Sequence, residues 1–172
     1  MIETPQQYTA RIVGILAGRD PLTVMDATPG RLRSLVSSAT PDQLAWKSSP
    51  ARWSITQILA HLADAEIVGA WRFRTVLERD GVPLQAYDQE TWASAFRYED
   101  APVAESLALF DALRGSTLRV LRTVDASRQT HVGMHAERGP ESITRLMEMY
   151  AGHDLNHLGQ IEGLLDQSRR AR

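Results

Sequence analysis

The stretch YAGHDLNHLGQI, residues 150–161, carries two histidines, His153 and His157, four positions apart on one expected helix. Apolar residues around it recur at the three-and-four spacing of a single helical face. These positions are Ile143, Leu146, Met147, Tyr150, Leu158, Ile161, Leu164 and Leu165. Because both histidines continue that face, we expect both imidazoles to point into the protein interior. Side chains four residues apart are adjacent on a helix, so the pair can share one metal ion. The alternative is a pair of hydrogen-bonded core histidines.

A third ligand would have to come from another helix, and His61 is the candidate. Ser54 and Gln57 occupy the two positions of a capping box, which predicts a helix that begins at Ser54 and continues to about Arg79. His61 lies beside the apolar face of that helix. Trp53, directly before the cap, is expected to serve the fold and not the chemistry. Three imidazoles from two helices could therefore converge inside a bundle, where such folds place metal ions.

Helical patterns elsewhere in the chain complete an all-α prediction. They cover residues 4–17, 22–38, 54–79, 102–124 and 141–167, and Pro29 and Gly30 form a possible break in the second of them. Residues 40–50 have the composition of a loop, and no strand-forming run of consequence occurs. The connections 80–102 and 125–141 are too long for tight turns, and the second could hold a short hairpin. We therefore expect a four-helix bundle with long crossover connections and an additional N-terminal helix.

Length and composition are those of an ordinary globular protein. The 172 residues, 43% hydrophobic and 23% charged, fit a single domain spanning residues 1–172. A formal net charge of −2 gives no electrostatic reason to expect a nucleic acid partner. No run of about 18 apolar residues and no signal-peptide pattern occurs, so we expect no membrane partner and a cytoplasmic location. Because the chain has no cysteine, disulfides, thiolate ligands and a cysteine nucleophile are excluded, and any thiol must come from a substrate.

The three-histidine set His61, His153 and His157 predicts a particular kind of metal chemistry. Three protein ligands with an open position are typical of catalytic zinc, and imidazole ligands also suit nickel, iron and copper. We take zinc or nickel as first candidates for the divalent ion. Neutral ligands leave the ion its full charge, which favours deprotonation of a bound water or thiol. Asp64 and Gln160, each three residues after a candidate ligand, could accept hydrogen bonds from the imidazoles, or could be ordinary helix-surface residues.

A second pair of histidines, His131 and His135, also lies four residues apart. Gly133 between them, and Gly139 and Pro140 after them, argue against the regular helix that gives this spacing its meaning. We expect this pair either in a loop near the site or on the surface.

Five short pieces of the sequence, taken in their order, resemble the DinB/YfiT superfamily. The pieces are residues 53–55 (WSI), 61–66 (HLADAE), 87–92 (YDQETW), 133–139 (GMHAERG) and 153–161 (HDLNHLGQI). The resemblance implies a four-helix bundle of unusual connectivity, a divalent metal on His61, His153 and His157, and often a homodimer. Members of this superfamily include S-transferases that use bacillithiol, mycothiol or similar thiols, a maleylpyruvate isomerase, and proteins labelled as metal-dependent hydrolases.

The functional expectation is a metal-dependent enzyme that activates a low-molecular-weight thiol for S-transfer to an electrophile. Its partners would be a small-molecule thiol and an electrophilic substrate. The alternatives are a hydrolase that uses metal-activated water and a non-catalytic bundle that binds metal for assembly or ligand binding.

Overall fold

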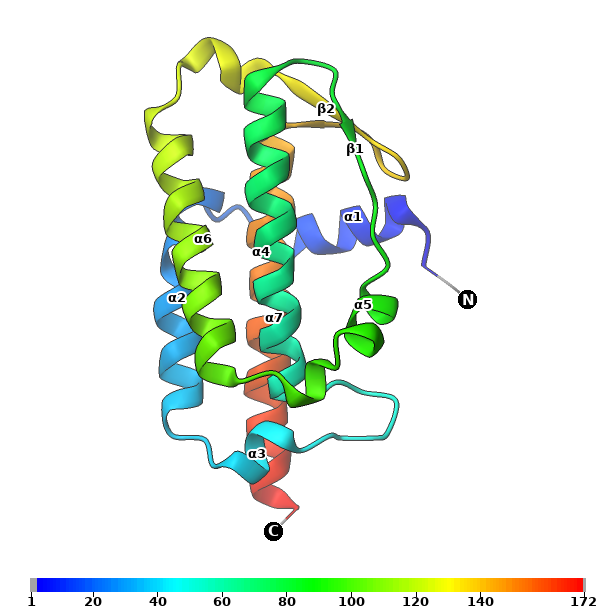
Figure 1. The fold of residues 1–172 in the computed structure, drawn as a ribbon, viewed down its shortest axis with the longest axis vertical. Helices are drawn as coiled ribbons and strands as arrows, with labels where there is room; N and C mark the ends of the chain where they lie inside the picture. Colours follow the sequence, from blue (N-terminus) through cyan, green and yellow to red (C-terminus); the bar gives the residue numbers. More distant parts are fainter. Residues whose placement is uncertain (1–2, 172) are drawn as a thin grey trace.

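The protein is mainly helical, with one small sheet (Figure 1). The structure is a computed structural model that describes residues 3–171. In chain order the α-helices are α1 Pro5–Gly14, α2 Pro21–Ser37, α3 Pro41–Ala45, α4 Ile55–Glu78, α5 Gln89–Ala95, α6 Val103–Thr123 and α7 Ile143–Arg170. The strands are β1 Pro83–Leu84, β2 Val132–His135 and β3 Gly139–Ser142, and the 3-10 turns are Tyr98–Asp100 and Ala126–Thr130. No helix in this part of the chain is both long enough and apolar enough to span a membrane.

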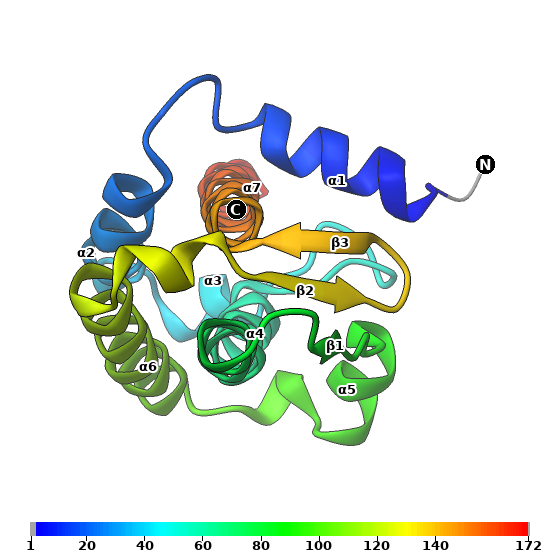
Figure 2. The ribbon, with the colours of Figure 1, turned by 90° about the horizontal axis from the view of Figure 1, so that it is seen from above.

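The four long helices α2, α4, α6 and α7 form the bundle. Each of them packs against two others, in the cyclic order α2, α6, α4, α7 (Figure 2). The sequence colours show that α4 and α6 run in one direction, and α2 and α7 in the other (Figure 1). The neighbours α4 and α6 are parallel because the chain returns along the bundle between them, through β1 and α5. This arrangement confirms the expected four-helix bundle with a crossover connection.

The two long connections meet in a three-stranded sheet at one end of the bundle. Strand β1 pairs in parallel with β2, with Leu84 opposite His135, and β2 pairs in antiparallel fashion with β3. The short hairpin that the connection 125–141 could hold is therefore present, whereas the parallel partner β1 was not predicted. A Cβ at Gly133 would lie within 2.7 Å of the side chains of both Leu84 and Val76, so a glycine is needed for this close packing. Strands of two to four residues are too short for a periodic signal.

Several helix boundaries differ from the prediction. Helix α1 ends at Gly14 and not near Ala17, because Ala17 and Gly18 turn the chain with positive φ angles of 49° and 79°. The segment 40–50, predicted as a loop, contains the short helix α3, which Thr40 and Gln43 begin with a capping box. Helix α7 begins at Ile143 and continues to Arg170, three residues beyond the predicted end.

Helix α2 continues through Pro29 as one helix, so the possible break at Pro29 and Gly30 does not occur. A proline inside a helix has no N–H to donate to the carbonyl four residues earlier, which here belongs to Met25. That carbonyl accepts a hydrogen bond of 2.9 Å from Nη1 of Arg114, on α6. The buried arginine therefore satisfies the group that the proline leaves free, and the helix remains continuous.

Arg114 is also the centre of a buried charged network. It is 0% exposed, donates to both carboxylate oxygens of Asp154 at 2.6 and 3.0 Å, and donates to Glu66 at 2.7 Å. These residues come from α6, α7 and α4, and the bond to Met25 adds α2. The network therefore joins all four bundle helices, between one apolar cluster around Phe73 and another around Phe110.

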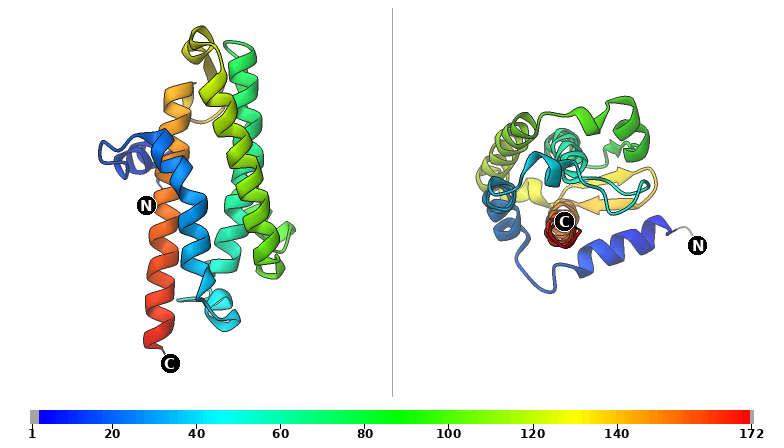
Figure 3. Two further views of the ribbon diagram at one scale, coloured as in Figure 1. Left: turned by 90° about the vertical axis from the view of Figure 1, so that its left-hand side faces the viewer. Right: turned by 90° about the horizontal axis from the view of Figure 1, so that it is seen from below.

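Helix α1 lies across the bundle and packs on α7 (Figure 3). A Cβ at Gly152 would lie 2.2 Å from the carbonyl oxygen of Ile12, so only glycine allows α1 to approach this closely. The crossing places Tyr8 and Arg11 of α1 beside the part of α7 that carries His153 and His157.

Candidate metal centre

Three imidazoles meet between α4 and α7. Nε2 of His61, on α4, lies 3.0 Å from Nε2 of His153, and Nε2 of His157 lies 3.1 Å from the same atom. Each residue offers one ring nitrogen such that all three atoms lie within 4.8 Å of one another. The histidines that the sequence singled out are thus brought together, as the helical spacing of His153 and His157 requires.

Burial keeps the three imidazoles neutral. His61 is 1% exposed and His157 is 6% exposed, while His153 is partly exposed. Burial, followed by the charge of His157, lowers the pKa of His61 to about 3, and burial lowers the pKa of His157 to about 4. Burial and the neighbouring imidazoles hold the pKa of His153 well below its usual range. All three rings therefore carry lone pairs at neutral pH, which is the form that binds metal ions.

One of the two residues expected to orient the imidazoles makes the contact, and the other does not. Nδ1 of His157 donates to Oε1 of Gln160 at 2.9 Å, so its proton lies on Nδ1 and the lone pair of Nε2 points at the other histidines. Asp64 instead accepts a hydrogen bond from the hydroxyl of Tyr98. Within the described residues, Nδ1 of His61 is buried without a hydrogen-bond partner.

Trp53 lies against the cluster as well as at the start of α4. Its ring centroid is 5.0 Å from that of His61 and 6.3 Å from that of Tyr98. The capping box of Ser54 and Gln57 is formed as predicted, so Trp53 occupies the position directly before the cap. The packing role expected for Trp53 therefore extends to the ring of a candidate ligand.

The cluster fits a divalent ion in geometry and in donor type. Two nitrogens that each lie about 2.05 Å from a tetrahedral ion are about 3.3 Å apart, close to the observed 3.0 and 3.1 Å. The lone pair of Nε2 of His157 faces the other two rings, and each neutral ring has one nitrogen lone pair that could bind an ion. Among the described residues, no carboxylate oxygen joins the cluster, so an ion held by the three histidines would have coordination positions left for small molecules.

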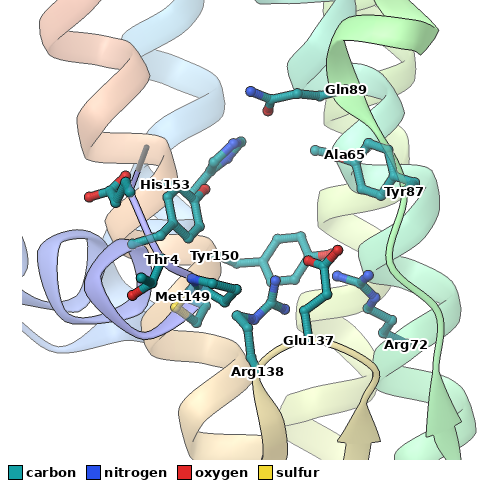
Figure 4. A pocket seen from close by; sticks show the side chains of 13 residues that line it. Thr4, Ala65, Arg72, Tyr87, Gln89, Glu137, Arg138, Met149, Tyr150 and His153 are labelled. Carbon is teal, nitrogen blue, oxygen red and sulfur yellow. The ribbon is translucent and has the colours of Figure 1, made fainter. Parts of the chain in front are cut away.

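Two cavities reach the cluster, one lined by His153 and the other by His157. The first, here called the His153 cavity, has a volume of about 310 Å³ and includes Arg72 and Tyr150 in its lining. The second, the His157 cavity, has a volume of about 470 Å³ and is lined in part by Gln160. Figure 4 shows the His153 cavity, with side chains from α4, α7, the crossover connection and the hairpin turn. Because Tyr8 and Gln89 line both cavities, the two spaces adjoin.

The rival pair of histidines does not join the site. Nδ1 of His131 donates to the carbonyl of Val76 at 2.9 Å. His135 is buried in β2, where its Nδ1 accepts from the backbone N–H groups of Glu137 and Arg138. Burial, followed by the charge of Arg138, lowers the pKa of His135 to about 4. His135 is therefore a buried structural residue of the sheet, and the expectation of a surface or loop histidine was wrong for it.

Sequence reasoning missed the charged and phenolic residues of the His153 cavity. Arg72 lies next to Phe73 on α4, eleven residues after His61, so Arg72 and His61 share a helical face. An arginine at that spacing was the available signal. Tyr150 was assigned to the apolar stripe of α7, and its ring indeed packs on Phe73, but it also lines the cavity.

Fold and site together define a helical-bundle protein with a candidate three-histidine metal centre between two of its helices. The chain belongs to the DinB superfamily, whose family model matches residues 25–161. It is 27% identical to "Putative metal-dependent hydrolase YfiT" of Bacillus subtilis over 145 residues, 83% of this chain and 81% of that protein. It is 25% identical to "Putative metal-dependent hydrolase OB0782" of Oceanobacillus iheyensis over 158 residues, 92% of this chain and 91% of that one.

A solved structure shares the architecture. The structure of Bacillus subtilis YfiT, described as a probable metal-dependent hydrolase with an unusual four-helix bundle topology, matches with a TM-score of 0.79. The match covers 88% of this chain and 85% of the other, at 25% sequence identity. The parallel arrangement of α4 and α6 is therefore part of a shared topology.

Proposed function

We propose that this protein is a metal-dependent S-transferase, in which His61, His153 and His157 hold a divalent ion and a low-molecular-weight thiol attacks an electrophile. Zinc or nickel is the first candidate for the ion, with iron or copper as alternatives. The observation that carries the proposal is the convergence of three neutral Nε2 atoms where two adjoining cavities meet. A transferase needs space for two reactants beside one reacting centre, and each cavity provides one such space.

The residues of this chain leave the sulfur chemistry to the substrate. A bound divalent ion would lower the pKa of a coordinating thiol, which is otherwise mostly protonated at pH 7. The chain has no cysteine, so the nucleophilic sulfur must be that of the small thiol. That sulfur forms a bond to the electrophilic carbon, the leaving group departs with its electron pair, and the thiol proton passes to solvent. Gln160 fixes the ring of His157 in the orientation that this arrangement uses.

Hydrolysis is the second candidate, because the relatives carry the name of metal-dependent hydrolases. A hydrolase would use water as the nucleophile and gains from a carboxylate that accepts its proton. The carboxylate that lines the His157 cavity is Glu90, which is exposed and is not part of the histidine cluster. The His153 cavity is lined by Glu3, which is paired with Arg11, and by Glu137 on the hairpin turn. Among the described residues no carboxylate lies in the cluster itself to act as a base for water, and this favours the thiol reaction over hydrolysis.

Metal analysis of variants tests the site. We expect His61→Ala, His153→Ala and His157→Ala each to lose most of the bound metal, and His131→Ala and His135→Ala to retain it. The controls are matched in residue type, and neither lies in the cluster. Elemental analysis of protein purified without added metal gives the occupancy. Full metal occupancy in all three cluster variants would refute the three-histidine metal site.

A single-turnover assay then separates the two reactions. Metal-loaded and metal-stripped protein are compared for conjugation of bacillithiol, mycothiol, glutathione or coenzyme A to a chloronitrobenzene, and for hydrolysis of nitrophenyl acetate. We expect metal-dependent conjugation with at least one thiol, and its loss in His157→Ala. Metal-dependent ester hydrolysis without conjugation would establish the hydrolase instead. Equal rates with and without metal in both assays would leave the non-catalytic metal-binding bundle as the remaining interpretation.

A further inference from the structure

The His153 cavity contains a buried arginine that has no carboxylate partner. Arg72 is only 6% exposed, yet among the described residues it forms no salt bridge. Its Nη2 donates to the backbone carbonyl of Gln85 and lies 3.3 Å from Nε2 of His135, a neutral ring. Its Nε is buried without a hydrogen-bond partner among the described residues. A guanidinium stays charged in proteins, so a largely buried positive charge lies here without a salt bridge.

Two other buried or half-buried arginines, Arg114 and Arg138, are compensated by carboxylates, whereas the half-buried Arg74 bonds to the backbone of Ala70 and to Ser116. Arg114 binds two carboxylates, and Arg138, at the cavity rim, forms a double hydrogen bond with Glu141 at 2.7 and 3.0 Å. Among the described residues those two charges form salt bridges, whereas Arg72 forms none with the carboxylates that line its cavity. Because a buried charge without a partner is costly, an anionic ligand that pairs with Arg72 would be stabilised here.

The neighbours of Arg72 in the cavity are also suited to an anion. Tyr8, Tyr87 and Tyr150 line the same space, and within the described residues none of their hydroxyls has a hydrogen-bond partner. Burial raises the pKa of Tyr87 to about 12 and raises that of Tyr8 and Tyr150, so the hydroxyls remain protonated donors. An anion beside Arg72 would therefore meet both a positive charge and several O–H groups.

Two acidic side chains also line the cavity. Glu3 is already paired with Arg11, at 2.8 Å. Glu137, on the exposed hairpin turn, extends its carboxylate toward the space in front of Arg72 without forming a salt bridge (Figure 4). Glu137 is thus a weak internal competitor, placed where it would be displaced by a ligand that reaches Arg72 directly.

We propose that the His153 cavity binds substrates that carry a carboxylate, and that Arg72 is the residue that holds it. The role in catalysis rests on the function proposed above, since it makes Arg72 a specificity residue for one of the two reactants. His61 and Arg72 are separated by about 16 Å along α4, so the carboxylate and the reacting group of such a substrate lie within that span. The cavity volume of about 310 Å³ suits a molecule of this size.

Binding of benzoate tests the proposal without any turnover. Its affinity is measured by ligand-observed NMR, on protein as purified and after metal removal, with benzamide as the neutral probe of the same shape. We expect benzoate to bind both forms and benzamide to bind at least tenfold more weakly. Arg72→Met should weaken benzoate binding about ten- to a hundredfold, the usual effect of losing a charged hydrogen bond. Arg72→Lys, which keeps the charge, should bind with intermediate affinity.

Matched variants keep the result interpretable. Arg74→Met removes an arginine from the same helix, one that is bonded to Ser116 away from the cavity, and should leave benzoate binding unchanged. Glu137→Gln removes the competing carboxylate and should tighten binding. If Arg72→Met does not fold, the benzoate affinity of Arg72→Lys relative to wild type tests the proposal instead.

Three results would overturn the proposal: wild-type benzoate affinity in the Arg72 variants, equal binding of benzamide and benzoate, or loss of benzoate binding on metal removal. If carboxylate binding fails but metal-dependent thiol conjugation is observed, the proposed S-transferase function stands and the role of Arg72 does not. If benzoate binds as expected but no thiol is conjugated, the carboxylate site stands and the S-transferase function does not.

Discussion

The buried network around Arg114 makes a strong prediction about stability. Arg114→Met removes the cation that compensates Asp154 and Glu66, and it removes the donor to the carbonyl of Met25 that Pro29 leaves free. Breaking a buried ion pair from one side costs about 3–5 kcal/mol, because the remaining charge stays buried without a partner. For a chain of this size each kcal/mol corresponds to about 2–4 °C in melting temperature, so we expect a decrease of about 6–20 °C.

The effect should depend on pH, with a sign that follows from Glu66. Burial raises the pKa of Glu66 above its ordinary value of 4.5, and the charge of Arg114 opposes that rise. A carboxyl whose pKa is raised by folding stabilises the folded state fully below its unfolded pKa and loses this contribution as pH rises through the folded pKa. Without Arg114 the pKa of Glu66 rises further, so the variant should lose more stability at pH 7 than at pH 5.

Urea unfolding followed by circular dichroism at both pH values measures this prediction. The control is Arg33→Met, which breaks the exposed pair with Asp111 and should cost at most about 1 kcal/mol. A loss below about 1 kcal/mol in Arg114→Met, or an equal loss at pH 5 and pH 7, would refute the reasoning from buried charge.

Two further predictions concern α4 and the histidine cluster. Ser54→Ala removes the side chain that caps α4 and should cost about 1 kcal/mol, read as a lower urea midpoint; an unchanged midpoint would contradict the role of the cap. Gln160→Leu removes the acceptor of the His157 proton, and it should weaken metal affinity about 10- to 100-fold in a competition titration. Asp64→Asn changes only the hydrogen bond with Tyr98, so it should leave metal affinity nearly unchanged. A larger effect from Asp64→Asn would reverse the assignment of these two residues.

Local signals were enough to predict the main helices and the histidine cluster. The capping box at Ser54 fixed the start of α4, and therefore the direction in which His61 points. The four-residue spacing of His153 and His157 needed only the geometry of a helix. These features depend on residues close together in the sequence, which is why they could be predicted from sequence alone.

Features that depend on distant residues could not be predicted in the same way. The continuity of α2 at Pro29 depends on a donor from Arg114, a residue far along the chain whose burial no local pattern indicated. Strand β1 exists because residues 83–84 meet β2, about fifty residues later. The lack of a salt bridge at Arg72 among the described residues is likewise a property of the assembled cavity, since it depends on which carboxylates the fold brings near.

The same two helices carry both the charged network and the neutral histidine cluster. Asp154 directly follows His153 on α7, so the two side chains point about 100° apart, and both oxygens of Asp154 are bound to Arg114. The negative charge of Asp154 is therefore paired with Arg114 and would not offset the charge of an ion held by the imidazoles. The charge of Arg114 is also one cause of the lowered pKa of His153, which keeps that ring neutral. Because α4 contributes Glu66 to one cluster and His61 to the other, the packing that compensates the buried charges also fixes how the three histidines face one another.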